Sequence, residues 1–129
     1  MPASIKAVIT GHSRGLGAAM AEALLDREIP VLACSRQGND HLAARFPDLL
    51  LESRHDLRDI DTLAEWLTGE EIRAFCRDAH TLILINNAGV MDLPTRQTTA
   101  DGHEMQFGVN YLSHFALTAA LLRLLRQGQ

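Results

Sequence analysis

A glycine-rich loop with the sequence TGHSRGLG, residues 10–17, follows a short apolar run and precedes a helical pattern. Gly11 allows a tight turn out of the first strand, and Gly15 allows the backbone to approach a phosphate without an intervening Cβ. Gly17 allows the helix to pack close to that strand, and the N–H groups of the helix N-terminus attract an anion. This loop in this position predicts a site for the phosphates of a nucleotide.

Three other kinds of site, a P-loop, a zinc site and a serine hydrolase site, match the sequence poorly. A phosphate-binding P-loop ends in Gly-Lys-Ser/Thr, whereas this loop ends in Leu-Gly-Ala. The stretch HEMQF, residues 103–107, lacks the second histidine of a zinc-binding HExxH helix. Ser113 and His114 are neighbours in sequence and point to different helix faces, so the histidine is not oriented to activate the serine as in a serine hydrolase. We therefore predict no metal site. The other histidines lack ligand spacing and are expected to face solvent or a loop: His12, His41, His55 and His80.

Strand and helix patterns alternate along the chain. The predicted strands cover residues 5–10, 30–35, 49–54 and 81–86. The predicted helices cover residues 16–27, a short stretch ended by Pro47, residues 59–79 with a break near Gly69, and a last stretch that ends near Gln127. Two pairs have capping-box spacing: Thr68 with Glu71, and Thr98 with Asp101.

This alternation predicts an α/β fold, a Rossmann-like doubly wound parallel sheet with helices on both faces. Right-handed crossovers and a nucleotide-binding first turn give the strand order 3-2-1-4, truncated after the fourth strand and its following helix. We expect residues 1–129 to form a single domain.

Composition limits the classes of partner. The chain has 47% apolar and 22% charged residues and a net charge of −4 with both signs interleaved, so neither nucleic acid nor membrane is an expected partner. The apolar runs are too short to span a bilayer, and the start of the chain lacks a signal-peptide pattern. Cys34 and Cys76 are expected to be buried thiols in a reducing compartment, the cytoplasm.

The spacing Gly11-x-x-x-Gly15-x-Gly17 resembles the loop of the short-chain dehydrogenase/reductase family. Three further motifs match that family: NNAG at residues 86–89, Asn110 in MQFGVNYLSHFALT, and the pair Asp56-Leu57 after the third strand. The stretch DGHEMQFGVNYLSHFALT is most similar to the retinol dehydrogenase and WW-domain oxidoreductase branch. The resemblance covers the whole chain but only about the first half of the family's domain.

The resemblance implies roles for single residues. Ser13 and the N–H of Leu16 would face the cofactor's pyrophosphate, with His12 near the phosphates. Asp56 and Leu57 would hold the adenine. The adenosine ribose would be lined by Asn86, Ala88 and Gly89. Asn110 would belong to the catalytic group, with its main chain holding a water of the proton relay.

Two arginines favour NADP(H) over NAD(H). An NAD site typically has an acid after the second strand, but this chain has Ser35 and Arg36 there, with no acid until Asp40. A guanidinium can bind a 2′-phosphate through charge-assisted bonds worth about 1.5–3 kcal/mol each. Arg14, inside the loop, adds a second cation, as in NADP-preferring members of the family that the chain resembles.

The proton-transfer group of that family is missing. Its serine, tyrosine and lysine include a Tyr-x-x-x-Lys spacing, in which the ammonium lowers the tyrosine pKa. Here the single tyrosine, Tyr111, has Phe115 four residues later, and the only lysine is Lys6 in the first strand. In the family the motif follows a fifth strand that this sequence does not contain, so we expect the 129 residues alone to be weakly active or inactive.

Three hypotheses remain open. The chain is an NADP(H)-dependent oxidoreductase that transfers hydride between the cofactor and a small-molecule carbonyl or alcohol, with its Ser-Tyr-Lys half outside this sequence. Alternatively, it is a catalytically inactive NADP(H)-binding module, or a fragment or half-domain that assembles with copies of itself. An apolar fourth strand left at the sheet edge invites pairing. We therefore expect a homo-oligomer formed through that edge or through the leucine-rich last helix.

Overall fold

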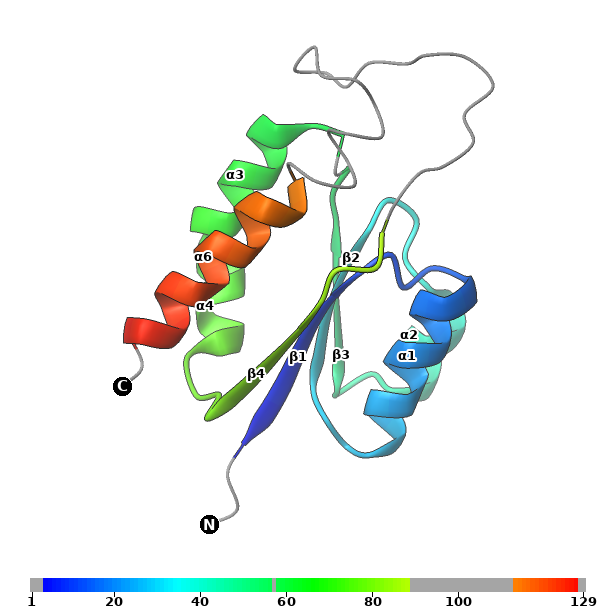
Figure 1. The fold of residues 1–129 in the computed structure, drawn as a ribbon. Coiled ribbons are helices and arrows are strands. Elements are labelled where there is room, and N and C mark those ends of the chain that lie inside the picture. Colours follow the sequence, from blue (N-terminus) through cyan, green and yellow to red (C-terminus); the bar gives the residue numbers. More distant parts are fainter. Residues whose placement is uncertain (1–3, 57, 89–112, 128–129) are drawn as a thin grey trace, which may run out of the picture.

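The structure is a computed structural model that describes residues 4–56, 58–88 and 113–127 (Figure 1). Its strands are β1 (Ile5–Thr10), β2 (Val31–Ser35), β3 (Leu50–Arg54) and β4 (Thr81–Ile85). Its helices are α1 (Gly15–Asp26), α2 (Asp40–Arg45), α3 (Ile60–Thr68), α4 (Glu70–Cys76) and α6 (Ser113–Gln127). The strands are parallel and lie in the order β3-β2-β1-β4, which confirms the predicted α/β class and sheet order.

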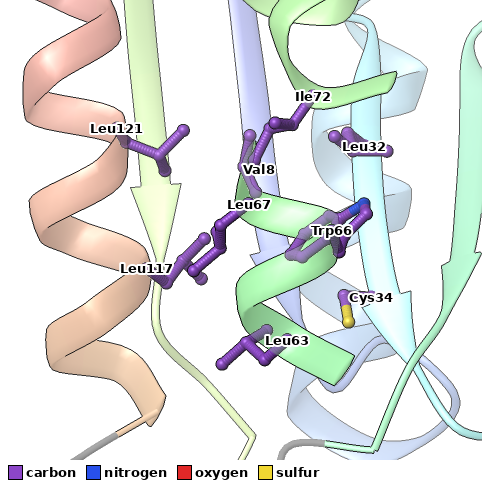
Figure 2. Close-up of a cluster of buried hydrophobic side chains, with 9 residues drawn as sticks. All are labelled: Val8, Leu32, Cys34, Leu63, Trp66, Leu67, Ile72, Leu117 and Leu121. Atoms are coloured by element: carbon purple, nitrogen blue, oxygen red, sulfur yellow. The ribbon is translucent and has the colours of Figure 1, made fainter. Parts of the chain in front are cut away.

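Helices cover both faces of the sheet, with α1 and α2 on one face and α3, α4 and α6 on the other (Figure 1). Alternating strand residues feed two separate cores. The first contains Ala7, Ile9, Ala21, Leu25, Val31, Ala33 and Leu42. The second contains Val8, Leu32, Cys34, Leu63, Trp66, Leu67, Ile72, Leu117 and Leu121 (Figure 2). Because burying one such large apolar side chain contributes about 1.5–3 kcal/mol, the two cores hold the helices on the sheet.

The register brings the carboxyl ends of the strands to one edge of the sheet. Thr10 of β1 pairs with Cys34 of β2, and Ser35 pairs with Arg54 of β3. Ile9 pairs with Ile85 at the end of β4. The loops that follow all four strands therefore begin side by side, at the edge where doubly wound sheets bind ligands.

The predicted capping box of Thr68 and Glu71 is wrong. Gly69 is the N-cap of α4, and no side chain caps that helix. The Thr68 hydroxyl donates back to the Ala64 carbonyl, 3.0 Å away, as threonines in a last helical turn do. Glu71 instead accepts a hydrogen bond from the indole of Trp66 at 3.1 Å. The second predicted box, Thr98 with Asp101, lies outside the described residues.

Both cysteines are free thiols; Cys34 is buried, as predicted, whereas Cys76, at the end of α4, is only half-buried. Burial raises the pKa of Cys34 to about 12 and that of Cys76 to about 11, so neither is a thiolate at neutral pH. In the described part of the chain, no helix has the length and apolar character needed to cross a lipid bilayer.

Candidate nucleotide-binding site

The glycine-rich loop has the backbone conformation that its glycines suggest. Gly11 and Gly15 have φ angles of +78° and +61°, in the left-handed region that favours glycine. A Cβ on Gly11 would lie 2.9 Å from the Ala88 Cα, and one on Gly17 would collide with the Gly11 carbonyl oxygen. At Gly15, by contrast, no described atom lies within 4 Å of that position. The loop is thus closed towards the protein and open at Gly15, as the approach of a phosphate requires.

The N-terminus of α1 faces this open position. Arg14 is its N-cap residue in extended conformation, and no side chain caps the helix. The N–H groups of the first turn, including that of Leu16, are therefore free of a capping side chain and available to an anion. Leu16 itself is 69% exposed, and Ser13 is half-buried beside it.

Thr10 joins this loop to the segment after β4. Its buried hydroxyl oxygen accepts from the backbone N–H groups of Asn87, at 3.1 Å, and Ala88, at 3.0 Å. The Nε2 atom of His114 lies 2.8 Å from the same oxygen. Because the two N–H donors occupy both lone pairs, the hydroxyl proton must point to Nε2, which makes that nitrogen an acceptor. His114, which the sequence did not single out as a site residue, thereby links α6 to the loop.

Two asparagines after β4 add hydrogen bonds to the glycine-rich loop and to α6. Asn87 donates its side-chain amide to the Gly11 carbonyl at 3.1 Å. Asn86 donates to the Thr118 hydroxyl on α6 at 3.2 Å. Ala88 packs directly on Gly11, so the structure brings Ala88 to the glycine-rich loop, whereas the side chain of Asn86 turns to α6. The predicted site residues Gly89, Asn110 and Leu57 lie outside the described residues, as does Tyr111.

Positive charge gathers after β2 and β3. Arg36 is exposed immediately after β2, and Arg14 is exposed at the start of α1. Arg58, which no sequence motif singled out, holds Asp56 with its Nε 2.9 Å from both carboxylate oxygens and its Nη2 2.6 Å from Oδ2. These bonds, helped by the nearby charge of Arg36, outweigh burial and lower the pKa of Asp56. An Asp-x-Arg spacing just after a strand is the signal that could have revealed the pair.

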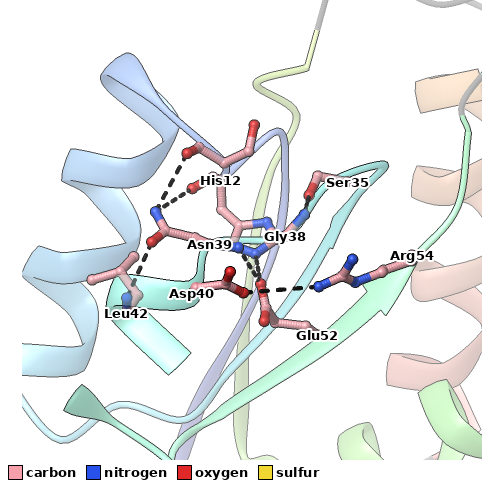
Figure 3. A network of polar contacts seen from close by, with 9 residues as sticks. His12, Ser35, Gly38, Asn39, Asp40, Leu42, Glu52 and Arg54 are labelled. Carbon is pink, nitrogen blue, oxygen red and sulfur yellow. Dashed lines mark hydrogen bonds and ion pairs between the residues drawn. The ribbon is translucent and has the colours of Figure 1, made fainter. Parts of the chain in front are cut away.

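His12 corrects one expectation from the sequence. It was expected to face solvent or a loop, but its side chain is fully buried, with Nε2 2.5 Å from a carboxylate oxygen of Glu52 (Figure 3). The reason lies in the strand register, since Glu52 pairs with Ala33 and so lies on the sheet face of α1 and α2. A carboxylate partner offsets the cost of burying the imidazole.

The remaining histidines behave differently from one another. His55 is half-buried and packs on Trp66, with the ring centroids 5.3 Å apart, which also corrects the expectation for it. His41 and His80 are exposed, as expected. Among residues 4–56, 58–88 and 113–127, no group of His, Cys, Asp and Glu side chains could hold a metal ion.

A 3-2-1-4 parallel sheet with a glycine-rich turn between β1 and α1 defines the Rossmann class of nucleotide-binding folds. The family model described as short chain dehydrogenase matches residues 6–129, and the chain belongs to this family. Membership implies a nicotinamide dinucleotide, NAD or NADP, as the cofactor. The open backbone at Gly15, the uncapped start of α1 and the exposed Arg36 fit such a group.

Similar proteins agree with this assignment. Retinol dehydrogenase 11 of Mus musculus is 41% identical over 128 residues, which cover 94% of this chain and 39% of that protein. Polyprenol dehydrogenase of Danio rerio is 32% identical over 124 residues, covering 94% and 38% respectively. The crystal structure of a short-chain dehydrogenase/reductase from Burkholderia vietnamiensis superimposes with a TM-score of 0.82 at 38% identity, covering 93% of this chain and 56% of that one. The chain spans about two fifths of the length of these curated relatives.

Proposed function

We propose that this chain forms the NADP(H)-binding part of a short-chain dehydrogenase/reductase that acts on a carbonyl or alcohol. The observation that carries the proposal is the loop at residues 10–17, closed by Ala88 at Gly11 and open at Gly15 in front of the uncapped α1. The bound dinucleotide would supply or accept the hydride. Gly11, Ser13, Gly15, Leu16 and Gly17 would hold its pyrophosphate.

Arg36 and Arg14 support NADP(H) as the form that binds. Both are exposed, and no ion pair in the described part of the chain engages either of them. The turn after β2 is closed by a 2.9 Å hydrogen bond from the Gly38 N–H to the Ser35 hydroxyl, which places Arg36 at its tip. Arg36 would bind the 2′-phosphate through charge-assisted bonds that a ribose hydroxyl cannot match.

Asp56 would lie next to the adenine, with Arg58 fixing its carboxylate. Asn86 and Ala88 would line the ribose from the segment after β4, where Thr10 holds the backbone. The roles of Gly89, Leu57 and Asn110 stay predictions from the family motifs, and so does a cytoplasmic location.

A second candidate function is a cofactor-binding or assembly module without catalysis of its own. It is favoured by the position of the only lysine, Lys6, whose ammonium donates to the Phe75 carbonyl at 2.8 Å near the amino end of β1. That is the opposite end of the sheet from the glycine-rich loop. Within the described residues, therefore, no ammonium is available to lower the pKa of a tyrosine general acid.

The chain also has surfaces through which it could associate with copies of itself. Phe115 and Leu122, on α6, are 65% and 55% exposed, and among the described strands β4 lies at the edge of the sheet, with its residues mostly half-buried. These surfaces support a homo-oligomer formed through α6 or β4.

Nucleotide titration tests the proposed function. The 129-residue chain is titrated with NADPH and with NADH, following nucleotide fluorescence, alongside Arg36→Ala and a matched control, Arg73→Ala, at an exposed position of α4. We expect NADPH to bind preferentially, and Arg36→Ala to raise its Kd about ten- to a hundredfold while leaving NADH unchanged. A folded chain that binds neither nucleotide would overturn the proposal.

A further inference from the structure

A partly buried polar network joins the glycine-rich loop, the loop after β2 and strand β3 (Figure 3). We propose that Glu52, at the centre of this network, is a positioning residue that selects for the 2′-phosphate of the dinucleotide. It does so by fixing the loop that carries Arg14 relative to the loop that carries Arg36. This inference rests on the proposed NADP(H) binding.

Two hydrogen bonds place Glu52 between the loops. Its Oε2 accepts from His12 Nε2 at 2.5 Å and from the Asn39 backbone N–H at 2.7 Å. A carboxylate only accepts, so His12 Nε2 must carry a proton. A single oxygen atom, Glu52 Oε2, thus binds both loops. It holds His12, two residues before Arg14, and Asn39, three residues after Arg36.

Asn39 adds a direct tie between the same loops. Its side-chain amide donates to the His12 carbonyl at 3.1 Å and approaches the Ser13 carbonyl at 3.5 Å. Its side-chain oxygen accepts from the Leu42 N–H at 3.1 Å and so caps α2. The two loops and the start of α2 therefore form one hydrogen-bonded unit with Glu52.

Gly38 shows that the loop after β2 is shaped around this carboxylate. It has a φ of +73°, and a Cβ there would lie 2.9 Å from Glu52 Oε2. The Ser35 hydroxyl accepts from its N–H, closing the turn that has Arg36 at its tip. A displacement of Glu52 would therefore move the turn that presents Arg36.

Stability alone does not account for the pair. The His12 side chain is 0% exposed and that of Glu52 16% exposed, so both polar groups lose most of their hydration. An apolar pair of similar size at such a position is often as stable as, or more stable than, a polar one. The polar groups add defined geometry, because the short hydrogen bonds from His12 and from the Asn39 N–H to Glu52 Oε2 fix the glycine-rich loop and the loop after β2 at set positions.

The test measures how far Glu52 variants change the preference for NADPH over NADH. Glu52→Leu removes the acceptor at similar volume, and Glu52→Gln keeps an acceptor oxygen. Glu65→Leu, at an exposed position of α3, is the matched control. We expect Glu52→Leu to raise the Kd for NADPH about tenfold and that for NADH less than about threefold. Glu52→Gln should restore most of the preference, and Glu65→Leu should not change it.

A double variant separates a loss of nucleotide preference from a loss of folding. His12→Ala/Glu52→Leu replaces the pair by apolar groups and should keep a cooperative thermal transition by circular dichroism, yet lose the preference as Glu52→Leu does. A preference that survives in Glu52→Leu or in the double variant would overturn the inference, as would equal weakening of both nucleotides. If the unaltered chain itself shows no preference for NADPH, the proposed function fails instead, so the two failures are distinguishable.

Discussion

The two halves of the candidate site are held together by different means. The glycine-rich loop and the segment after β4 meet through close packing and uncharged groups, with Gly11 against Ala88 and the Thr10 hydroxyl accepting from two backbone N–H groups. In the other half, the carboxylate of Glu52 on β3 holds the loop after β2 through the Asn39 N–H, and Arg58 holds Asp56 in the loop after β3. The first half depends on shape and the second on charge. Substitutions should therefore affect stability most in the first and nucleotide preference most in the second.

Gly17→Ala should have the largest effect, because its methyl group would collide with the Gly11 carbonyl and crowd the Asn87 amide. We expect a loss of at least about 1–3 kcal/mol of unfolding free energy and a Tm lowered by on the order of 10 °C, measured by circular dichroism. Gly15→Ala is the matched control, where space is open and only the φ of +61° is strained, at about 1–2 kcal/mol. A larger loss at Gly15 than at Gly17 would contradict the shape argument.

Thr10→Val should come next. It is nearly isosteric but leaves the N–H groups of Asn87 and Ala88 without their acceptor. Because both residues are only half-buried, we expect a combined loss of about 1–2 kcal/mol. Urea unfolding should show this loss, while Thr10→Ser retains most of the stability. Thr81→Val, at the exposed start of β4, should leave the midpoint unchanged. Equal midpoints for the two valine variants would show that the hydroxyl does not hold the loop to the segment after β4.

Much of the shape-dependent half could be predicted from sequence. Glycine spacing reports local backbone geometry, and apolar strands with helical patterns between them give the sheet order. The charge-dependent half depends on register. His12 and Glu52 are 40 residues apart and meet only because β3 pairs with β2 so that Glu52 lies beside Ala33. His114 reaches Thr10 only because α6 packs on the sheet through Leu117 and Leu121. No local pattern encodes these contacts.

Arg58→Gln should have the smallest effect on stability, and it should depend on pH. The arginine lowers the folded-state pKa of Asp56 below its ordinary value of 3.8. The pair's stabilisation is therefore fully present above that value and is lost as the pH falls through the folded-state pKa. Because both side chains are partly exposed, we expect a difference of at most about 1 kcal/mol at pH 7 that shrinks near pH 3. A difference that stays constant from pH 7 to pH 3, measured by urea unfolding with Arg73→Gln as control, would rule out this coupling.

The salt dependence of nucleotide binding by the unaltered chain tests the central claim most directly. The Kd values for NADPH and NADH are measured by calorimetry at about 0.02 M and about 0.3 M salt, over which screening of exposed charges increases strongly. If exposed arginines bind the 2′-phosphate, NADPH binds more tightly at low salt and its Kd rises several-fold at high salt, while the Kd of NADH, which carries only the pyrophosphate charges, rises less. Equal affinities with equal salt dependence would contradict the account, because the arginines after β2 and before α1 would then make no distinction between the two nucleotides.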